Sequence, residues 1–216
     1  MPKRLPSPPS RSPRPDPFTL ARRAGFRLIA GVDEAGRGPW AGPVVSAAVV
    51  LYTERLPVRI DDSKRLTPLQ RARAFPVILA NADVGIGIVS AEVIDRINIL
   101  QATFHTMQQA VAELRLAPDL VLVDGHLTPP LSMPCWPVID GDARSYVISC
   151  ASIIAKLVRD RLMAFYHRLY PRYQFDQHKG YGTPLHTSAL RQWGPSLLHR
   201  QTFSPVADVA IPTLTR

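Results

Sequence analysis

The chain has 216 residues, 46% of them hydrophobic, and a formal net charge of +9. This length and composition are enough to bury one sizeable core, and the positive charge favours a polyanionic partner such as nucleic acid. No apolar run approaches the roughly 20 residues of a membrane span, and the basic N-terminus lacks the apolar stretch of a secretory signal. We therefore expect a cytoplasmic protein that does not enter a membrane.

The N-terminus differs in composition from the rest of the chain. Residues 1–17 carry seven of the 22 prolines, so we predict a disordered or polyproline-II tail there. The tail is either simply solvated or a basic arm that adds nonspecific affinity for nucleic acid. The folded domain is expected over residues 18–216. Cys135 and Cys150 lack metal-ligand spacing, so we expect reduced thiols, with one disulfide as the alternative.

Hydrophobic periodicity and turn residues predict a mixed α/β domain with helices on the faces of a sheet. In chain order, the expected strands are residues 26–33, 43–52, 83–90, 119–123 and 136–139. The expected helices are residues 68–80, 91–97, 99–116, 143–170 and 184–193, with Thr67 and Ser90 as N-caps. The short first connection predicts an antiparallel pair, and 136–139 is expected at a sheet edge. Residues 172–182 are expected to form an aromatic and basic loop.

Carboxylates follow two of the apolar runs. Asp33 and Asp124 each end an expected buried strand, where a carboxylate is costly unless it is paired, hydrated or bound to metal. Ligands bind at the carboxyl edge of open α/β sheets, so the two can share a metal if their strands are neighbours. Asp142 precedes the long helix and is either an N-cap or a third ligand. Because adjacent strand residues point to opposite faces, Glu34 can join only if the strand ends at Asp33.

These oxygen ligands occur without a cluster of histidine and cysteine, which favours Mg²⁺ or Mn²⁺ over zinc. His126, His178 and His186 lack zinc spacing and are expected at the surface or behind the site. Gly36-Arg37-Gly38 offers bare backbone that can approach a phosphodiester, although the same residues also suit an exposed turn.

The expected long helix carries small hydroxyls and charges along one stripe. The stripe consists of Ser145, Ser149, Ser152, Lys156 and Asp160. Such a stripe suits close approach to a phosphate backbone, but an ordinary solvated face has the same spacing.

Several of these segments, taken together, resemble the type 2 ribonucleases H, in particular the bacterial ribonuclease HII family. The matching blocks, in family order, are residues 31–39, 62–66, 123–125, 141–142 with 151–156 and 159–160, and 179–183 with His186. The resemblance covers about residues 26–205. The related ribonuclease HIII family carries an extra folded N-terminal domain, whereas 32 residues, many of them proline, precede Asp33 here.

The resemblance implies an RNase H-like fold, with a mixed central sheet flanked by helices and a small C-terminal helical segment that binds substrate. It implies an endonuclease that uses Mn²⁺ or Mg²⁺, with two ions during catalysis. Its substrates would be the RNA strand of RNA–DNA hybrids and ribonucleotides embedded in duplex DNA, and the products would carry 5′-phosphate and 3′-hydroxyl ends. The implied catalytic metal ligands are Asp33, Glu34, Asp124 and Asp142.

The resemblance also implies substrate-binding residues, which are Gly36, Arg37, Gly38, Ser63, Lys64, Ser152, Lys156 and Tyr181. The glycine segment matches a loop that senses the ribose 2′-hydroxyl, largely through backbone atoms. Tyr181 matches an aromatic residue that packs at the junction between a ribonucleotide and the following deoxyribonucleotide. The serines and lysines match positions near phosphates. Residues 199–203 look like a degenerate basic-aromatic segment, and we assign them no substrate contact.

Two other classes of protein were weighed. In a noncatalytic nucleic-acid-binding module, four carboxylates beside the phosphates would not strengthen binding, so this class is disfavoured. A metal-dependent phosphatase for small molecules is disfavoured by the basic surplus and the aromatic loop. We expect a monomeric nuclease.

Overall fold

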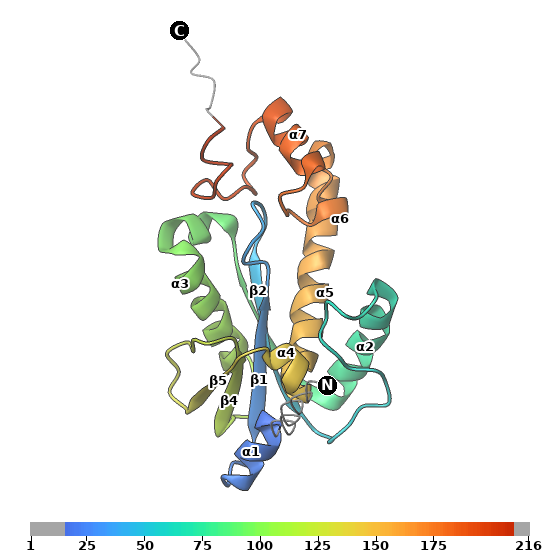
Figure 1. The fold of residues 1–216 in the computed structure, drawn as a ribbon, viewed down its shortest axis with the longest axis vertical. Coiled ribbons are helices and arrows are strands. Elements are labelled where there is room, and N and C mark those ends of the chain that lie inside the picture. Colours follow the sequence, from blue (N-terminus) through green and yellow to red (C-terminus); the bar gives the residue numbers. More distant parts are fainter. Residues whose placement is uncertain (1–15, 210–216) are drawn as a thin grey trace, which may run out of the picture.

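The computed structural model describes residues 16–209 and contains a five-stranded sheet with helices on both faces (Figure 1). The strand order is β3-β2-β1-β4-β5. The strands are β1 (Ile29–Ala35), β2 (Val44–Leu51), β3 (Ala82–Val89), β4 (Leu120–Asp124) and β5 (Cys135–Val138). The first three pair antiparallel, whereas β1, β4 and β5 are parallel. All five predicted strands are therefore present, and β5 lies at the edge as expected.

The N-terminal helix α1 (Pro17–Arg23) was not predicted. Asp16 caps it by accepting from the backbone N–H groups of Phe18 and Thr19. The helix therefore begins within the predicted tail, and the rest of that tail, residues 1–15, lies outside the described part of the chain.

Two predicted N-caps are confirmed. The hydroxyl of Thr67 and the side chain of Gln70 form a capping box at the start of α2 (Pro68–Asn81). Ser90 caps α3 (Ala91–Ala112), which contains a break at Asn98 where the backbone leaves helical geometry. The two predicted helices therefore exist as halves of α3, and the second ends at residue 112 rather than 116.

The predicted long helix over 143–170 is divided in two. A short helix, α4 (Gly141–Arg144), is followed by α5 (Tyr146–Leu169). Between them, Ser145 has extended backbone angles, which turn the chain before α5 begins. The break leaves Asp142 inside α4, so Asp142 does not cap the long helix.

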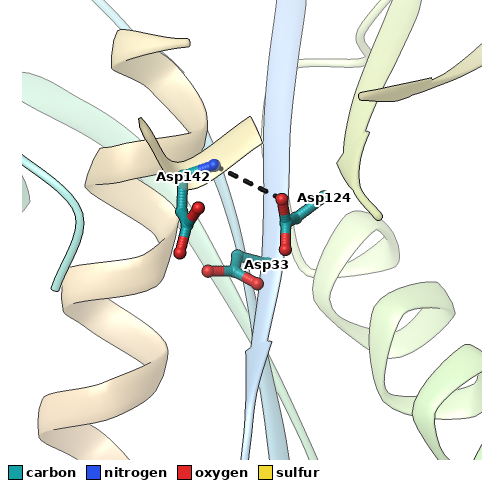
Figure 2. A group of neighbouring side chains, drawn as sticks. All are labelled: Asp33, Asp124 and Asp142. Atoms are coloured by element: carbon teal, nitrogen blue, oxygen red, sulfur yellow. Dashed lines mark hydrogen bonds between the residues drawn. The ribbon is translucent and has the colours of Figure 1, made fainter. Parts of the chain in front are cut away.

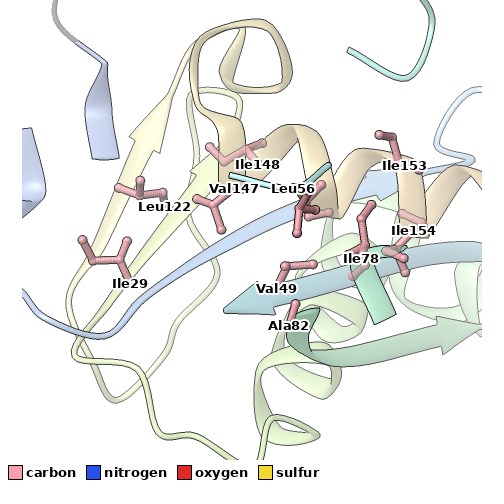
Figure 3. Packing of buried hydrophobic residues seen from close by; sticks show 14 of the residues in the cluster. Ile29, Val49, Leu56, Ile78, Ala82, Leu122, Val147, Ile148, Ile153 and Ile154 are labelled. Carbon is pink, nitrogen blue, oxygen red and sulfur yellow. The ribbon is translucent and has the colours of Figure 1, made fainter. Parts of the chain in front are cut away.

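Helix α5 packs across one face of the sheet beside α2, and α3 covers the other face (Figure 1). Figure 3 shows Val147, Ile148 and Ile154 of α5 against strand residues such as Val49 and Leu122. The close approach requires a glycine, since a Cβ at Gly31 would lie 2.5 Å from the backbone of α5. Helix α5 therefore runs directly beside β1, close to Asp33.

The predicted loop over 172–182 contains two short helical turns. They are η1 (Pro171–Tyr173) and α6 (Phe175–His178), and the stacked rings of Tyr173 and Phe175 are buried against Met163. Helix α7 (Pro184–Trp193) follows as predicted. These elements form the predicted C-terminal helical segment at one end of α5 (Figure 1). None of the described helices is long and apolar enough to cross a bilayer.

Candidate active site

Three carboxylates converge at the carboxyl ends of β1 and β4. Val32 and Val123 are register partners in the parallel pair, so the following residues, Asp33 and Asp124, lie side by side. Asp142 approaches from α4, and one oxygen from each of the three aspartates lies within 4.8 Å of the others (Figure 2). The strands of Asp33 and Asp124 are neighbours, so the condition on which the two could share a metal is met.

Backbone groups of α4 hold the carboxylate of Asp124. Its Oδ1 accepts from the N–H of Gly141 at 2.7 Å. It also accepts from the N–H of Asp142 at 3.3 Å, the bond drawn in Figure 2. These bonds fix α4 against the end of β4. An open cavity of about 430 Å³ is lined by Lys64, Asp124, His126 and Asp142, among others. The cluster can therefore be reached by a ligand from solvent.

Burial and neighbouring charges raise the pKa values of Asp33 and Asp124. Burial raises the pKa of Asp33 well above its usual range, and the charges of Glu34 and Asp124 raise it further. Burial and the charge of Asp142 raise the pKa of Asp124. Lys64 provides a counter-charge, with its Nζ 3.2 Å from Oδ2 of Asp142. Burial alone would lower the pKa of Lys64, but the carboxylates more than offset this effect and raise it.

Glu34 does not join the group of three. Strand β1 continues to Ala35, so Glu34 points to the same face as Ala30 and Val32, which pack on the α3 side. The condition that the sequence set, a strand ending at Asp33, is thus not met. An oxygen of Glu34 instead lies 3.5 Å from the guanidinium of Arg37. Burial nevertheless raises the pKa of Glu34, and the charge of Asp124 contributes.

The glycine loop, residues 36–43, links β1 to β2. Gly36 has a φ of +101°, and a Cβ there would lie 2.0 Å from Nε of Arg159, so both the backbone conformation and the packing require glycine. Arg37 and Gly38 are exposed. The carbonyls of Gly36 and Arg37 accept from the buried side chain of Arg200. Packing and hydrogen bonds therefore hold the loop in one conformation, and it is not the simple exposed turn that was the alternative.

Tyr181 lies next to this loop. The N–H of Trp40 donates to the carbonyl of Gly180 at 2.9 Å, which ties the segment around Tyr181 to the glycine loop. A Cβ built on Gly38 would be 3.9 Å from the Tyr181 ring, and Tyr181 is 43% exposed. The structure thus brings together two segments that are more than 140 positions apart in the sequence and offers an aromatic ring beside the loop.

The hydroxyls of the predicted stripe are largely engaged within the protein. Ser149 is buried and donates to the carbonyl of Asp142 at 2.7 Å. The hydroxyl oxygens of Ser152 and Ser63 share a hydrogen bond of 2.7 Å, and hydrogen bonding by Ser152 lowers the pKa of Asp33. Lys156 pairs with Asp160 at 2.8 Å. The stripe is therefore no solvated face, and its serines support the carboxylate cluster.

The histidines His178 and His186 are buried, and with His199 they form a cluster that the sequence did not predict. Nδ1 of His186 donates to the carbonyl of Tyr181, and its Nε2 accepts from Nε2 of His199 at 3.0 Å. Nδ1 of His199 in turn accepts from the N–H of Ser196. This chain of bonds requires neutral imidazoles. Burial accordingly lowers the pKa of His186 to about 4 and that of His199 to about 3.

Comparison with known proteins agrees with the resemblance. Residues 30–206 match the family model described as Ribonuclease HII. The Ribonuclease HII of Chlamydia muridarum is 53% identical over 190 residues, which is 87% of each chain. That of Chlamydia pneumoniae is 51% identical over 186 residues, 85% of this chain and 86% of the relative.

Solved structures share the fold. The crystal structure of the ribonuclease H2 from Pyrococcus horikoshii OT3 superposes with a TM-score of 0.70 at 27% identity. The alignment covers 85% of this chain and 97% of that one. The sheet, its flanking helices and the sequence relatives all lead to one conclusion: the chain belongs to the ribonuclease HII family, a family of nucleases with the RNase H-like fold.

Proposed function

We propose that this chain hydrolyses a phosphodiester at the Asp33–Asp124–Asp142 cluster: water attacks the phosphorus and the P–O3′ bond breaks, so that a 3′-hydroxyl and a 5′-phosphate remain. As a member of the ribonuclease HII family, the chain is an endoribonuclease that acts on RNA–DNA hybrids. The proposal adds single ribonucleotides within duplex DNA as substrates. The observation that carries it is the convergence of three carboxylates within 4.8 Å at the edge of a sheet.

The donor set fits hard divalent cations. Three carboxylates this close repel one another when ionised, as the raised pKa values of Asp33 and Asp124 indicate, and a divalent cation would relieve that repulsion. Asp33, Asp124 and Asp142 would hold the ion. Glu34 lies outside this group, but the charge of Asp124 raises its pKa, so the two carboxylates are near enough for Glu34 to be the proposed ligand of a second ion. When bound, Mn²⁺ or Mg²⁺ supplies an activated water and stabilises negative charge on the phosphorus and the leaving oxygen.

The chain's own residues position the cluster. Gly141 and Asp142 hold Asp124 in place with two backbone N–H groups, and Ser152 supports Asp33. Lys64 stands at 3.2 Å from Asp142, with a side chain that is 80% exposed. An exposed ammonium beside the carboxylates can attract a phosphate to the cavity. Lys64 is thus the strongest candidate among the predicted phosphate contacts.

The substrate-reading surface is proposed to be the glycine loop together with Tyr181. The 2′-hydroxyl, both a donor and an acceptor, distinguishes RNA from DNA. The exposed backbone of Arg37 and Gly38 can approach this hydroxyl without a side chain in the way. The partly exposed ring of Tyr181 can pack against the following deoxyribose, where a 2′-hydroxyl would crowd it. Lys156 and Ser63 are proposed near the phosphates.

The test is cleavage of a DNA duplex that carries one ribonucleotide, in the presence of Mn²⁺, with the products resolved on a gel. The wild-type chain should cut once, beside the ribonucleotide, and leave the all-DNA duplex intact. Asp124→Asn should be inactive. The matched control is Asp119→Asn, at the other end of β4, where the carboxylate caps the N–H groups of Arg27 and Leu28. Active Asp124→Asn protein, or uncut substrate with the wild type, would overturn the proposal.

A further inference from the structure

Two arginines lie buried beneath the glycine loop. Arg159 and Arg200 are 1% and 0% exposed, and no carboxylate of residues 16–209 lies within 4.0 Å of either guanidinium. Burial lowers the pKa of Arg159 to about 10 and that of Arg200 to about 9, and the charge of Arg159 contributes to the shift at Arg200. Both remain cationic at neutral pH. A buried cation without an ion pair is costly, so its hydrogen bonds must compensate.

Those hydrogen bonds go to backbone carbonyls. The guanidinium of Arg200 donates to the carbonyls of Gly36 at 2.5 Å, Arg37 at 2.8 Å and Gly42 at 3.0 Å. That of Arg159 donates to the carbonyls of Ala41, Pro43 and Lys179. Arg200 thus holds both ends of the glycine loop, and Arg159 ties the base of the loop to the segment that carries Tyr181.

This arrangement decides which way two peptide groups face. In a trans peptide the C=O and the following N–H point in opposite directions. Because the carbonyls of Gly36 and Arg37 point inward to Arg200, the N–H groups of Arg37 and Gly38 point outward. Both residues are exposed, and in the described part of the chain neither N–H has a hydrogen-bond partner. Two adjacent outward N–H groups can bind an oxygen of a ligand.

We propose that Arg200 is a positioning residue for substrate recognition: it fixes the outward N–H groups of Arg37 and Gly38 so that they bind an oxygen of the scissile ribonucleotide. Arg200 itself does not touch the substrate. The guanidinium also polarises the two peptide groups, which makes their N–H groups better donors. This inference rests on the proposed function, and it gives residues 199–203 a role behind the loop in place of a direct substrate contact.

The test compares Arg200→Lys with wild-type protein on a duplex with one ribonucleotide. Lysine keeps the charge, but one ammonium cannot reproduce the planar fork that reaches three carbonyls. We expect kcat/KM per folded molecule to fall at least about tenfold, mainly through a higher KM, because these N–H contacts exist in the ground state as well. The Mn²⁺ affinity, measured by calorimetry, should stay within twofold, since the carboxylate cluster is unchanged.

Val111→Ala is the matched control for stability. Val111 is buried between α3 and the sheet, away from the loop, so its truncation destabilises the fold without touching the arginines. Its kcat/KM, corrected for the folded fraction, should equal that of the wild type. If Arg200→Lys behaves like this control while the wild type cleaves, the positioning role is wrong. If the wild type does not cleave, the proposed function fails, and the inference fails with it.

A measurement on the wild-type protein covers the case in which Arg200→Lys does not fold. Amide hydrogen exchange by NMR, without metal, should show fast exchange at Arg37 and Gly38 in the free protein. A duplex with one ribonucleotide should protect both amides, and the all-DNA duplex of the same sequence should protect them less. Equal exchange with and without the ribonucleotide duplex would overturn the proposal.

Discussion

Replacing Asp124 with asparagine should raise the stability of the metal-free protein while it removes activity. Carboxylate oxygens of the three aspartates lie within 4.8 Å of one another. At that separation the repulsion between two unit charges is about 3.5 kcal/mol at an effective dielectric constant of 20 and about 1 kcal/mol at that of water. The site is open to solvent and Lys64 offsets part of the charge, so we expect Asp124→Asn to raise the free energy of unfolding by about 1–3 kcal/mol.

The stability that Asp124→Asn gains over the wild type should depend on pH and on bound metal. The pKa values of Asp33 and Asp124 are raised in the folded state, so their stabilising contribution is complete below about pH 4 and is lost as the pH rises through the raised pKa values. The advantage of Asp124→Asn should therefore be larger at pH 7.5 than at pH 5. Mn²⁺ should raise the melting temperature of the wild type and have less effect on the variant.

Thermal unfolding in the presence of a chelator measures the effect. A gain of this size corresponds to a rise of roughly 2–12 °C in melting temperature for a chain of this length. Cleavage should fall by more than about a hundredfold. Asp119→Asn is the control, and it should lose stability because its carboxylate accepts two backbone hydrogen bonds outside the cluster. The reasoning is refuted if Asp124→Asn melts below the wild type without metal.

Three further predictions concern the loops around the cluster. Tyr181→Ala should barely change the melting temperature, because Tyr181 is 43% exposed. Its rate of cleavage at a single ribonucleotide should fall more than its rate within a long RNA–DNA hybrid, and an unchanged ratio of these two rates would exclude junction sensing. Gly36→Ala should cost about 2 kcal/mol or more, measured by urea unfolding, because of its positive φ and the contact with Arg159. Because the pKa values of His186 and His199 are lowered in the folded state, their contribution to the free energy of unfolding is complete above about pH 6.5 and falls by about 2 kcal/mol per imidazole at pH 5. His199→Gln should reduce this pH dependence. A wild-type protein equally stable at pH 6.5 and at pH 5 would contradict the prediction.

The strands and most helices could be predicted from the sequence because their hydrophobic periodicity and caps are local signals. Thr67 with Pro68 and Gln70 marks the start of α2 unambiguously. The break at Ser145 has no stop signal such as proline, and it serves to place α4 against Asp124, so it could not be predicted in this way. Tertiary contacts decide such boundaries.

The two carboxylates of the candidate site that lie at strand ends could be predicted from the sequence. Asp33 and Asp124 follow buried strands, and topology then brings them together. The place of Glu34 depends on where β1 ends, which apolar spacing does not define. His199 and Arg200 carry no local signal of burial, because their partners, such as His186 and Gly36, are distant in sequence. Their roles became visible when the fold placed them behind the loop.

The hydrogen bond between Arg200 and Gly36 spans 164 positions of the chain, and it has a consequence for synthesis. Chains emerge from the ribosome N-terminal end first, so the sheet and α5 can form while the last residues are still being added. The carbonyls of Gly36 and Arg37, by contrast, have no such partner until Arg200 is available. A nascent or truncated chain that ends before this residue would have the carboxylate cluster and the hydrogen bonds from Arg159 to the base of the loop, but not those that fix Gly36 and Arg37. Under the proposal, the recognition loop therefore acquires its final conformation after the sheet and the cluster have formed.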